Sequence, residues 1–217
     1  MKICSNILRV TNLSKYEWFK TAVNGYSRNL ITIPKWTPEA SNRNLFTNSC
    51  INTYSEQHQR SITDPESYWG DIATNTIWFK PYEKVLDNSN PPFTKWFSGG
   101  KLNMCYNAVD RHIDEGNGNR NAIVWDSPIT NNKKTITYNE VLQKTAALAR
   151  VLINMKVKKG DRVLIYMSMT PEALIAMLAC ARIGAIHSVV FGGFSSKELG
   201  ARIRHCEPKV IITHILI

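Results

Sequence analysis

The second half of the chain alternates between short apolar runs and longer segments in which apolar residues have helical spacing. The apolar runs at 162–167, 187–191 and 209–213 are rich in β-branched side chains, and each predicts a buried strand. The segments between them, 171–183 and 195–206, have the length and spacing of helices. This order, with strands beginning about 22 to 25 residues apart, is typical of right-handed βαβ units in a parallel sheet. We therefore expect an α/β fold here.

Capping-box patterns mark the starts of two helices in this half of the chain. Thr137 followed by Glu140 is a capping-box pattern, and it predicts a further helix that runs to about Met155. The stripe that this helix would bury consists of Val141, Leu142, Thr145, Leu148, Ala149 and Leu152. A second capping box, at Ser195 and Glu198, opens the last helix.

The two ends of the predicted sheet differ in how they are covered. The helix over 171–183 is apolar nearly all round, so we expect it to be buried on more than one side. The strand at 209–213 is the last element that the pattern predicts, and no helix follows to cover it. We therefore expect its apolar surface and its edge to be left open.

The middle of the chain is less regular. Between Pro65 and Trp96 it is rich in aromatic residues and proline without a sustained period, which is typical of an irregular arm whose rings pack one by one. Lysines between these rings leave single-stranded nucleic acid as an alternative partner, but the rings lack the spacing of a binding sheet or repeat, so we expect no nucleic acid. Two short extended runs follow at 122–125 and 135–137.

A helix is predicted over 103–115, because apolar residues recur every four positions from Cys105 to Ile113. The charged triplet 110–112 lies within it. We interpret the triplet as a solvated or capped helix face, because the sequence shows no partners that would make it a functional group.

The first sixty residues have the composition of a leader. Eight Asn, six Ser and six Thr make up a third of them, and eight basic residues face three acidic ones, which supplies half of the chain's net charge of +10. They contain no continuous apolar core of a secretory signal. A basic, hydroxyl-rich, acid-poor leader is typical of import into the mitochondrial matrix. The alternative is a cytoplasmic protein with a plain disordered extension.

Cysteine content and hydropathy exclude several classes. The five cysteines are an odd number without a Cys-x-x-Cys pair or a histidine at metal-ligand spacing, so we expect neither a disulfide framework nor a metal site. The longest apolar run, 173–181, is about half of the length that a membrane-spanning helix needs. We expect no membrane span.

One turn stands out as a candidate binding site. Phe191, Gly192 and Gly193 follow a predicted parallel strand and precede a helix, where such sheets bind ligands. The two glycines would let the backbone approach an anion or an adenine. The alternative is a tight turn that needs a positive φ. The sequence contains no dinucleotide-binding, P-loop or nucleophile-elbow motif, so it identifies no catalytic residue. We interpret His187 as a core or boundary residue.

Longer blocks of residues resemble the N-terminal third of short-chain acyl-CoA synthetases over about 65–213. These blocks are Tyr68-Trp69-Gly70, Trp78-Phe79-Lys80-Pro81-Tyr82, Lys95-Trp96-Phe97, Leu102-Asn103, Asn107-Ala108-Val109-Asp110-Arg111-His112, Met177-Leu178-Ala179-Cys180-Ala181-Arg182-Ile183-Gly184-Ala185, His187-Ser188 and Phe191-Gly192-Gly193-Phe194. Within this family, the run 102–107 is more similar to the propionyl-CoA synthetase branch, the short-chain family member 3 type, than to the acetate branch.

The resemblance implies a two-step reaction. ATP and a short carboxylate would give an acyl-adenylate and pyrophosphate, Mg²⁺ would screen the phosphates, and the CoA thiol would then take the acyl group. Phe191, Gly192 and Gly193 match family positions that line the CoA nucleotide site. The family's Ser/Thr/Gly-rich loop for ATP phosphates has no counterpart in this sequence, so the resemblance implies that the ATP site, the acyl pocket and the catalytic lysine are absent.

These observations predict a particular organisation. We expect a leader over 1–60, an acetyl-CoA synthetase-type N-terminal domain over 61–120 that forms an irregular or helical arm, and the start of a βαβαβ adenylating domain over 121–217. We expect an N-terminal fragment of an AMP-forming ligase that acts on propionate or acetate, inactive by itself. The alternative is a non-enzymatic remnant that binds a partner. The oligomeric state and the preferred acyl length are left open.

Overall fold

The computed structural model describes residues 7–9 and 54–214. Contacts divide the chain into two compact units. The smaller one ends at Leu102, and the larger one begins at Asn103 and includes residues 7–9. The sequence pattern divides the folded part near residue 120 instead.

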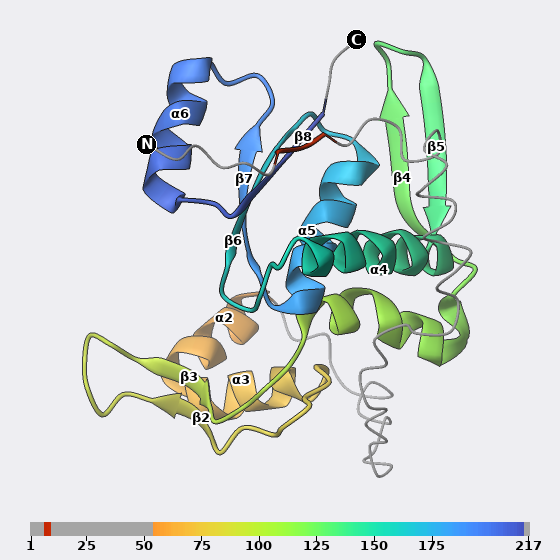
Figure 1. The fold of residues 1–217 in the computed structure, drawn as a ribbon. Coiled ribbons are helices and arrows are strands. Elements are labelled where there is room, and N and C mark those ends of the chain that lie inside the picture. Colours follow the sequence, from red (N-terminus) through yellow and green to blue (C-terminus); the bar gives the residue numbers. More distant parts are fainter. Residues whose placement is uncertain (1–6, 10–53, 215–217) are drawn as a thin grey trace. The chain divides into compact units, whose positions relative to one another are not determined.

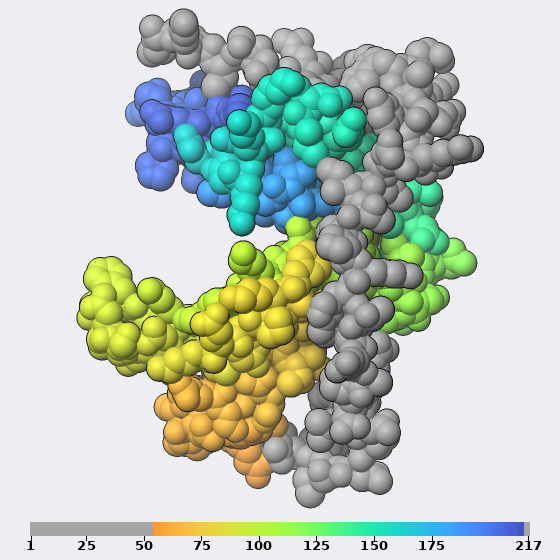
Figure 2. All heavy atoms as spheres, turned by 60° about the horizontal axis from the view of Figure 1, so that its bottom comes forward, coloured from red at the N-terminus to blue at the C-terminus, as the bar shows by residue number. Residues whose placement is uncertain are grey.

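The smaller unit holds two helices and a hairpin (Figure 1). The helices are α2 (Tyr54–Thr63) and α3 (Pro65–Ala73), and the antiparallel strands are β2 (Lys84–Asp87) and β3 (Lys95–Ser98). Asp64 caps α3, because its carboxylate accepts a hydrogen bond from the backbone N–H of Ser67 at 3.3 Å. The loop between β2 and β3 projects from the rest of this unit (Figures 1 and 2).

Aromatic side chains hold the smaller unit together. The rings of Trp78, Tyr82 and Phe97 contact one another with centroids 5.1 to 5.3 Å apart, and the Trp78 indole N–H donates to the carbonyl of Ala73 at 3.1 Å. The rings thus form a mutual cluster that joins regular elements, whereas the sequence pattern predicts rings that pack one by one in an irregular arm. The sequence pattern misses these elements because each is too short to show a sustained period. Helix α2 also begins at Tyr54, inside the segment that the composition assigns to a leader.

The larger unit is built on a four-stranded parallel sheet with the order β1-β8-β6-β7. Its strands are β1 (Ile7–Arg9), β6 (Arg162–Met167), β7 (Ile186–Phe191) and β8 (Val210–Thr213), its helices are α4 (Tyr138–Asn154), α5 (Pro171–Ile183) and α6 (Ser196–Cys206), and a separate hairpin consists of β4 (Asn121–Ser127) and β5 (Asn132–Thr137). The three strands and the three helices predicted from the second half are confirmed to within one residue at each end. Strand β1 is not expected from the sequence, which assigns residues 7–9 to the leader.

Helices cover both faces of this sheet (Figure 1). The chain runs from β6 through α5 to β7, and then back through α6 to β8 on the other side of β6. Because both crossovers are right-handed but run in opposite directions, α5 and α6 lie on opposite faces. Helix α4 packs on α5, and the main core lies between these two helices and the side chains of Val163, Ile165 and Ile212.

Apolar side chains are exposed on the edge strand β7 rather than on β8. Val210 and Ile212 are fully buried, because β8 lies between β6 and β1. The apolar side chains of Ile186, Val189 and Phe191 on β7 are 54%, 48% and 58% exposed. The expectation of an uncovered last strand is therefore wrong. It rested on the absence of a following helix, whereas the second crossover carries β8 past β6 and places it beside β1.

The segment between Asn103 and Gly118 is helical, as predicted, but much of it has π-helical turns, at Tyr106–Asp110 and Ile113–Asn117. Apolar residues four positions apart fit a π-helical turn as well as an α-helical one, so the spacing does not distinguish them. Among the described residues, no helix has the length and apolar character required to cross a membrane.

Candidate functional site

The predicted binding turn lies where the strands of the sheet end. Phe191 is the last residue of β7, and Gly192, Gly193 and Phe194 lead into α6. Ser195 caps α6, because its hydroxyl accepts a hydrogen bond from the backbone N–H of Glu198 at 3.4 Å. The structure thus places the three predicted site residues together at the carboxyl edge of the sheet, the edge at which parallel sheets bind ligands.

The two glycines do not adopt a left-handed backbone, and Gly192 is required for packing. Neither Gly192 nor Gly193 has a positive φ, so the alternative of a positive-φ turn is wrong. A Cβ on Gly192 would lie 2.9 Å from the backbone of Met167 and Ser168. A Cβ on Gly193 would lie 2.6 Å from the ring of Phe191. The missing side chain of Gly192 therefore lets the turn lie against the end of β6.

Two aromatic rings form the exposed surface of this turn. The rings of Phe191 and Phe194 meet edge to face, with centroids 5.9 Å apart and an angle of 77°. The Tyr166 hydroxyl, on β6, donates a hydrogen bond to the carbonyl of Phe194 at 2.9 Å and so fixes the turn to the sheet. Since Phe191 remains more than half exposed, the turn can offer an aromatic face to a planar ligand.

Sequence reasoning missed a cation at this turn. The guanidinium carbon of Arg202 lies 5.1 Å from the centroid of the Phe194 ring. A signal for it exists in the sequence, because Glu198 and Arg202 are four residues apart on one face of the predicted helix, and Phe194 directly precedes its cap residue Ser195. The cation beside the turn thus comes from α6.

A shallow hollow of about 260 Å³ lies beside the turn, between β7 and α6. It is lined by Ser188, Glu198, Ala201, Arg202, His205 and Cys206. His187, interpreted from the sequence as a core or boundary residue, is exposed on β7. The structure thus places ionisable side chains of α6 next to the aromatic turn.

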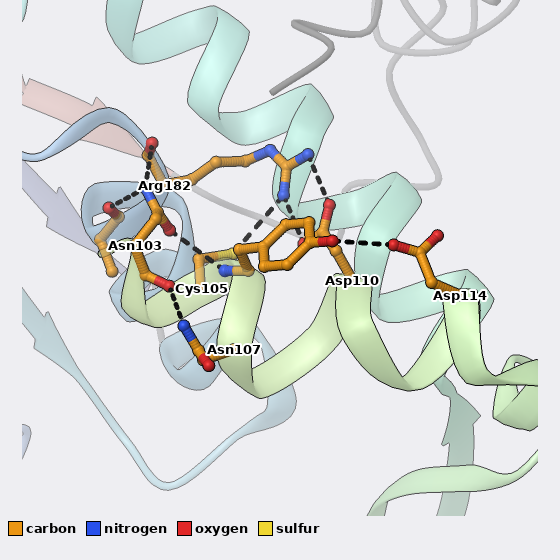
Figure 3. Close-up of polar contacts among 8 residues, drawn as sticks. Asn103, Cys105, Asn107, Asp110, Asp114 and Arg182 are labelled. Atoms are coloured by element: carbon orange, nitrogen blue, oxygen red, sulfur yellow. Dashed lines mark hydrogen bonds and ion pairs between the residues drawn. The ribbon is translucent and has the colours of Figure 1, made fainter. Parts of the chain in front are cut away.

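A second polar cluster lies in the larger unit, between the helical segment 103–117 and α5 (Figure 3). Arg182, near the end of α5, donates two hydrogen bonds to the carboxylate of Asp110, at 2.9 and 3.0 Å. The side chains of Arg182 and Asp110 are only 9% and 14% exposed. Burial lowers the pKa of Arg182, but the hydrogen bond and the charge of Asp110 outweigh it and raise the pKa overall. The interpretation of the triplet 110–112 as a solvated face is therefore wrong for Asp110.

Neighbouring side chains complete this cluster. The Asn103 amide donates to the carbonyls of Ala181 and Arg182, at 3.3 and 3.0 Å, and caps the end of α5. The Tyr106 hydroxyl donates to Asp114 at 3.0 Å, and burial together with this bond raises the pKa of Tyr106 to about 12. We interpret the cluster as the set of polar contacts that holds the helical segment 103–117 on α5.

The described cysteines do not form a reactive site. Cys105, Cys180 and Cys206 are free thiols, and the first two are fully buried. Burial raises the pKa of Cys105, and it raises the pKa of Cys180 to about 12, which disfavours the nucleophilic thiolate. Within residues 7–9 and 54–214, no group of three or more His, Cys, Asp or Glu side chains could hold a metal ion.

The chain matches two family models. Residues 54–108 match the acetyl-coenzyme A synthetase N-terminus, and residues 110–216 match the AMP-binding enzyme family. The boundary between these matches lies within the helical segment that Asn103 begins.

Curated proteins and solved structures agree with these matches. The chain is 57% identical over 160 residues to acyl-CoA synthetase short-chain family member 3, mitochondrial, of Bos taurus, which covers 74% of this chain and 23% of that protein. It is 49% identical over 176 residues to acetyl-coenzyme A synthetase of Rhizobium meliloti, which covers 80% of this chain and 26% of that protein. An acetoacetyl-CoA synthetase from Streptomyces lividans superposes with a TM-score of 0.67 and 26% identity, over 75% of this chain and 25% of that one.

The chain thus spans about a quarter of the length of the curated relatives that it matches. The two family matches adjoin each other, over residues 54–108 and 110–216, and relatives at 54–57% identity are short-chain acyl-CoA synthetases. The chain belongs to the short-chain acyl-CoA synthetase family of AMP-binding enzymes and corresponds to the N-terminal part of its members.

Proposed function

We propose that the chain is the N-terminal part of an AMP-forming acyl-CoA synthetase that acts on propionate or acetate. The complete enzyme would convert the carboxylate, ATP and CoA into acyl-CoA, AMP and pyrophosphate. The observation that carries this proposal is the adjoining pair of family matches over residues 54–108 and 110–216, together with 57% identity to a family member over 160 residues. The higher identity to short-chain family member 3 than to acetyl-coenzyme A synthetase favours the propionate branch.

Within the complete enzyme, Phe191, Gly192 and Gly193 would contact the CoA nucleotide. The turn formed by Phe191, Gly192 and Gly193 lies at the ligand-binding edge of the sheet, and the exposed ring of Phe191 offers a stacking surface for adenine. ATP and Mg²⁺ would bind outside this chain, and we assign no Mg²⁺ ligand among the described residues. We also retain the division into a leader over 1–60, an N-terminal domain over 61–120 and the start of the adenylating domain over 121–217.

The proposal is tested by a chimera in which residues 61–213 of this chain replace the matching segment of the Bos taurus short-chain family member 3. We expect this chimera to form acyl-CoA from propionate or acetate, ATP and CoA, because this chain is 57% identical to the Bos taurus protein over 160 residues. The matched control is the unmodified Bos taurus enzyme. A folded chimera that makes no acyl-CoA, beside an active control, would reject the proposed function.

We further propose that the chain is imported into the mitochondrial matrix. The basic, acid-poor composition of residues 1–60 supports this location, and so do the mitochondrial relatives at 54–57% identity. Residues 1–60 fused to a fluorescent protein should direct it to mitochondria. The control replaces the eight Lys and Arg residues of this segment by Gln and should leave the fluorescence in the cytoplasm. Cytoplasmic fluorescence of the unmodified fusion would contradict import and favour the extension without a targeting role.

A further inference from the structure

Arg202 is a cation held by an aromatic ring instead of by an acid. Its guanidinium lies over the Phe194 ring, and among the residues that the structure describes no carboxylate forms an ion pair with it. Arg60 and Arg182, by contrast, are paired with Asp71 and Asp110. The charge of Arg202 is therefore available to an anion from outside the chain.

The structure fixes the position of this charge. Side chains on a helix lean toward its N-terminus, so Arg202 reaches back from the second turn of α6 to the residue before its cap. Phe194 is itself held by the Tyr166 hydroxyl and by the edge of the Phe191 ring. Arg202 thus lies beside the turn.

The same side chain lines the hollow of about 260 Å³ beside the turn. Glu198 lies one helical turn away and lines this hollow too, yet it forms no ion pair with Arg202. A guanidinium presents a planar set of donors that matches a phosphate group, whereas an aromatic ring offers a stacking surface for a base. The turn, the ring and the hollow together suit an adenine nucleotide with a phosphate near α6.

We propose that Arg202 binds a phosphate of the CoA nucleotide whose adenine stacks at the Phe191–Phe194 turn. This inference rests on the proposed function, which makes CoA the ligand of the turn. The turn itself contains no basic residue, so α6 would supply the positive charge that contacts the phosphate. The negative charge of Glu198 then repels the bound phosphate and lowers its affinity.

The test measures binding by the complete 217-residue chain. Isothermal titration compares adenosine 3′,5′-bisphosphate, which carries the phosphate pattern of CoA, with AMP and with adenosine. We expect the bisphosphate to bind more tightly than AMP, and AMP more tightly than adenosine. Arg202→Leu should weaken bisphosphate binding about tenfold and leave adenosine binding unchanged, because a charge-assisted hydrogen bond is lost. Arg202→Lys should retain part of the affinity, and Glu198→Gln should increase it.

Arg204→Leu is the matched control, since it removes the same charge from a side chain of the same helix that is exposed, as Arg202 is, but that does not line the hollow. It should change the affinity by less than about twofold, because its charge would act on the phosphate only through solvent, where it is largely screened. Equal losses of bisphosphate affinity in Arg202→Leu and Arg204→Leu would show that only the net positive charge of the chain matters. That result would overturn the inference. A wild-type chain that binds the bisphosphate no better than adenosine would overturn it as well.

The chimera separates this inference from the proposed function. Arg202→Leu in the active chimera should raise the KM for CoA and leave the KM for ATP unchanged. An active chimera whose KM for CoA is unaffected by Arg202→Leu would reject the role of Arg202 alone. A chimera that makes no acyl-CoA would reject the proposed function, while the titration of the 217-residue chain would still report on Arg202.

Discussion

Replacing Asp110 by Ala is expected to lower the free energy of unfolding of the larger unit by about 3–5 kcal/mol, the cost of leaving one partner of a buried ion pair alone. The loss is large because Arg182 would keep its charge in a site where it is only 9% exposed. It would approach the whole stability of a marginal domain, about 5–15 kcal/mol. Urea unfolding of the 217-residue chain, followed by circular dichroism, measures the change.

Two controls show whether the charge pair is the cause. Asp126→Ala breaks an ion pair with Lys133 whose side chains are 53% and 78% exposed, and it should cost less than about 1 kcal/mol. The double variant Asp110→Leu with Arg182→Met replaces both charges by apolar groups and should recover most of the loss. If the urea midpoint of Asp110→Ala is no lower than that of Asp126→Ala, the pair does not hold the helical segment on α5 as we infer.

The second large effect is the absence of catalysis. The purified 217-residue chain is expected to form neither acyl-adenylate nor acyl-CoA from ATP, CoA and acetate or propionate. Adenylation requires several preorganised donors around the transferred phosphoryl group. In the part of the chain that the structure describes, the nucleotide contacts that we propose are those of the turn at Phe191–Phe194 and of Arg202, and binding without stabilisation of the transition state gives no rate.

Carboxylate-dependent pyrophosphate exchange measures the first step directly, with the active chimera as positive control and a heat-treated sample as blank. Exchange above the blank that disappears on a substitution within residues 61–217 would contradict the expectation. It would show that these residues contain a catalytic site.

Local patterns in the sequence determined the elements of the larger unit. The capping box at Thr137 and Glu140 is present in full, because the Glu140 carboxylate accepts from the Thr137 backbone N–H at 2.8 Å and Thr137 accepts from the Glu140 N–H at 3.3 Å. Runs of β-branched residues became β6, β7 and β8. Such signals are readable because a strand or helix start depends on residues within a few positions of one another. The candidate turn was found for the same reason, since it directly follows a strand.

Only the tertiary structure decided which elements and side chains meet. The order β8-β6-β7, and hence the edge position of β7, depends on the direction of a crossover, which the residues of β8 do not encode locally. The partners Asp110 and Arg182 are 72 residues apart in sequence, so neither reveals the other. Gly192 is required because the backbone of β6 lies beside it. Each of these contacts joins positions distant in the chain, and it exists only once packing has brought the strands and helices together.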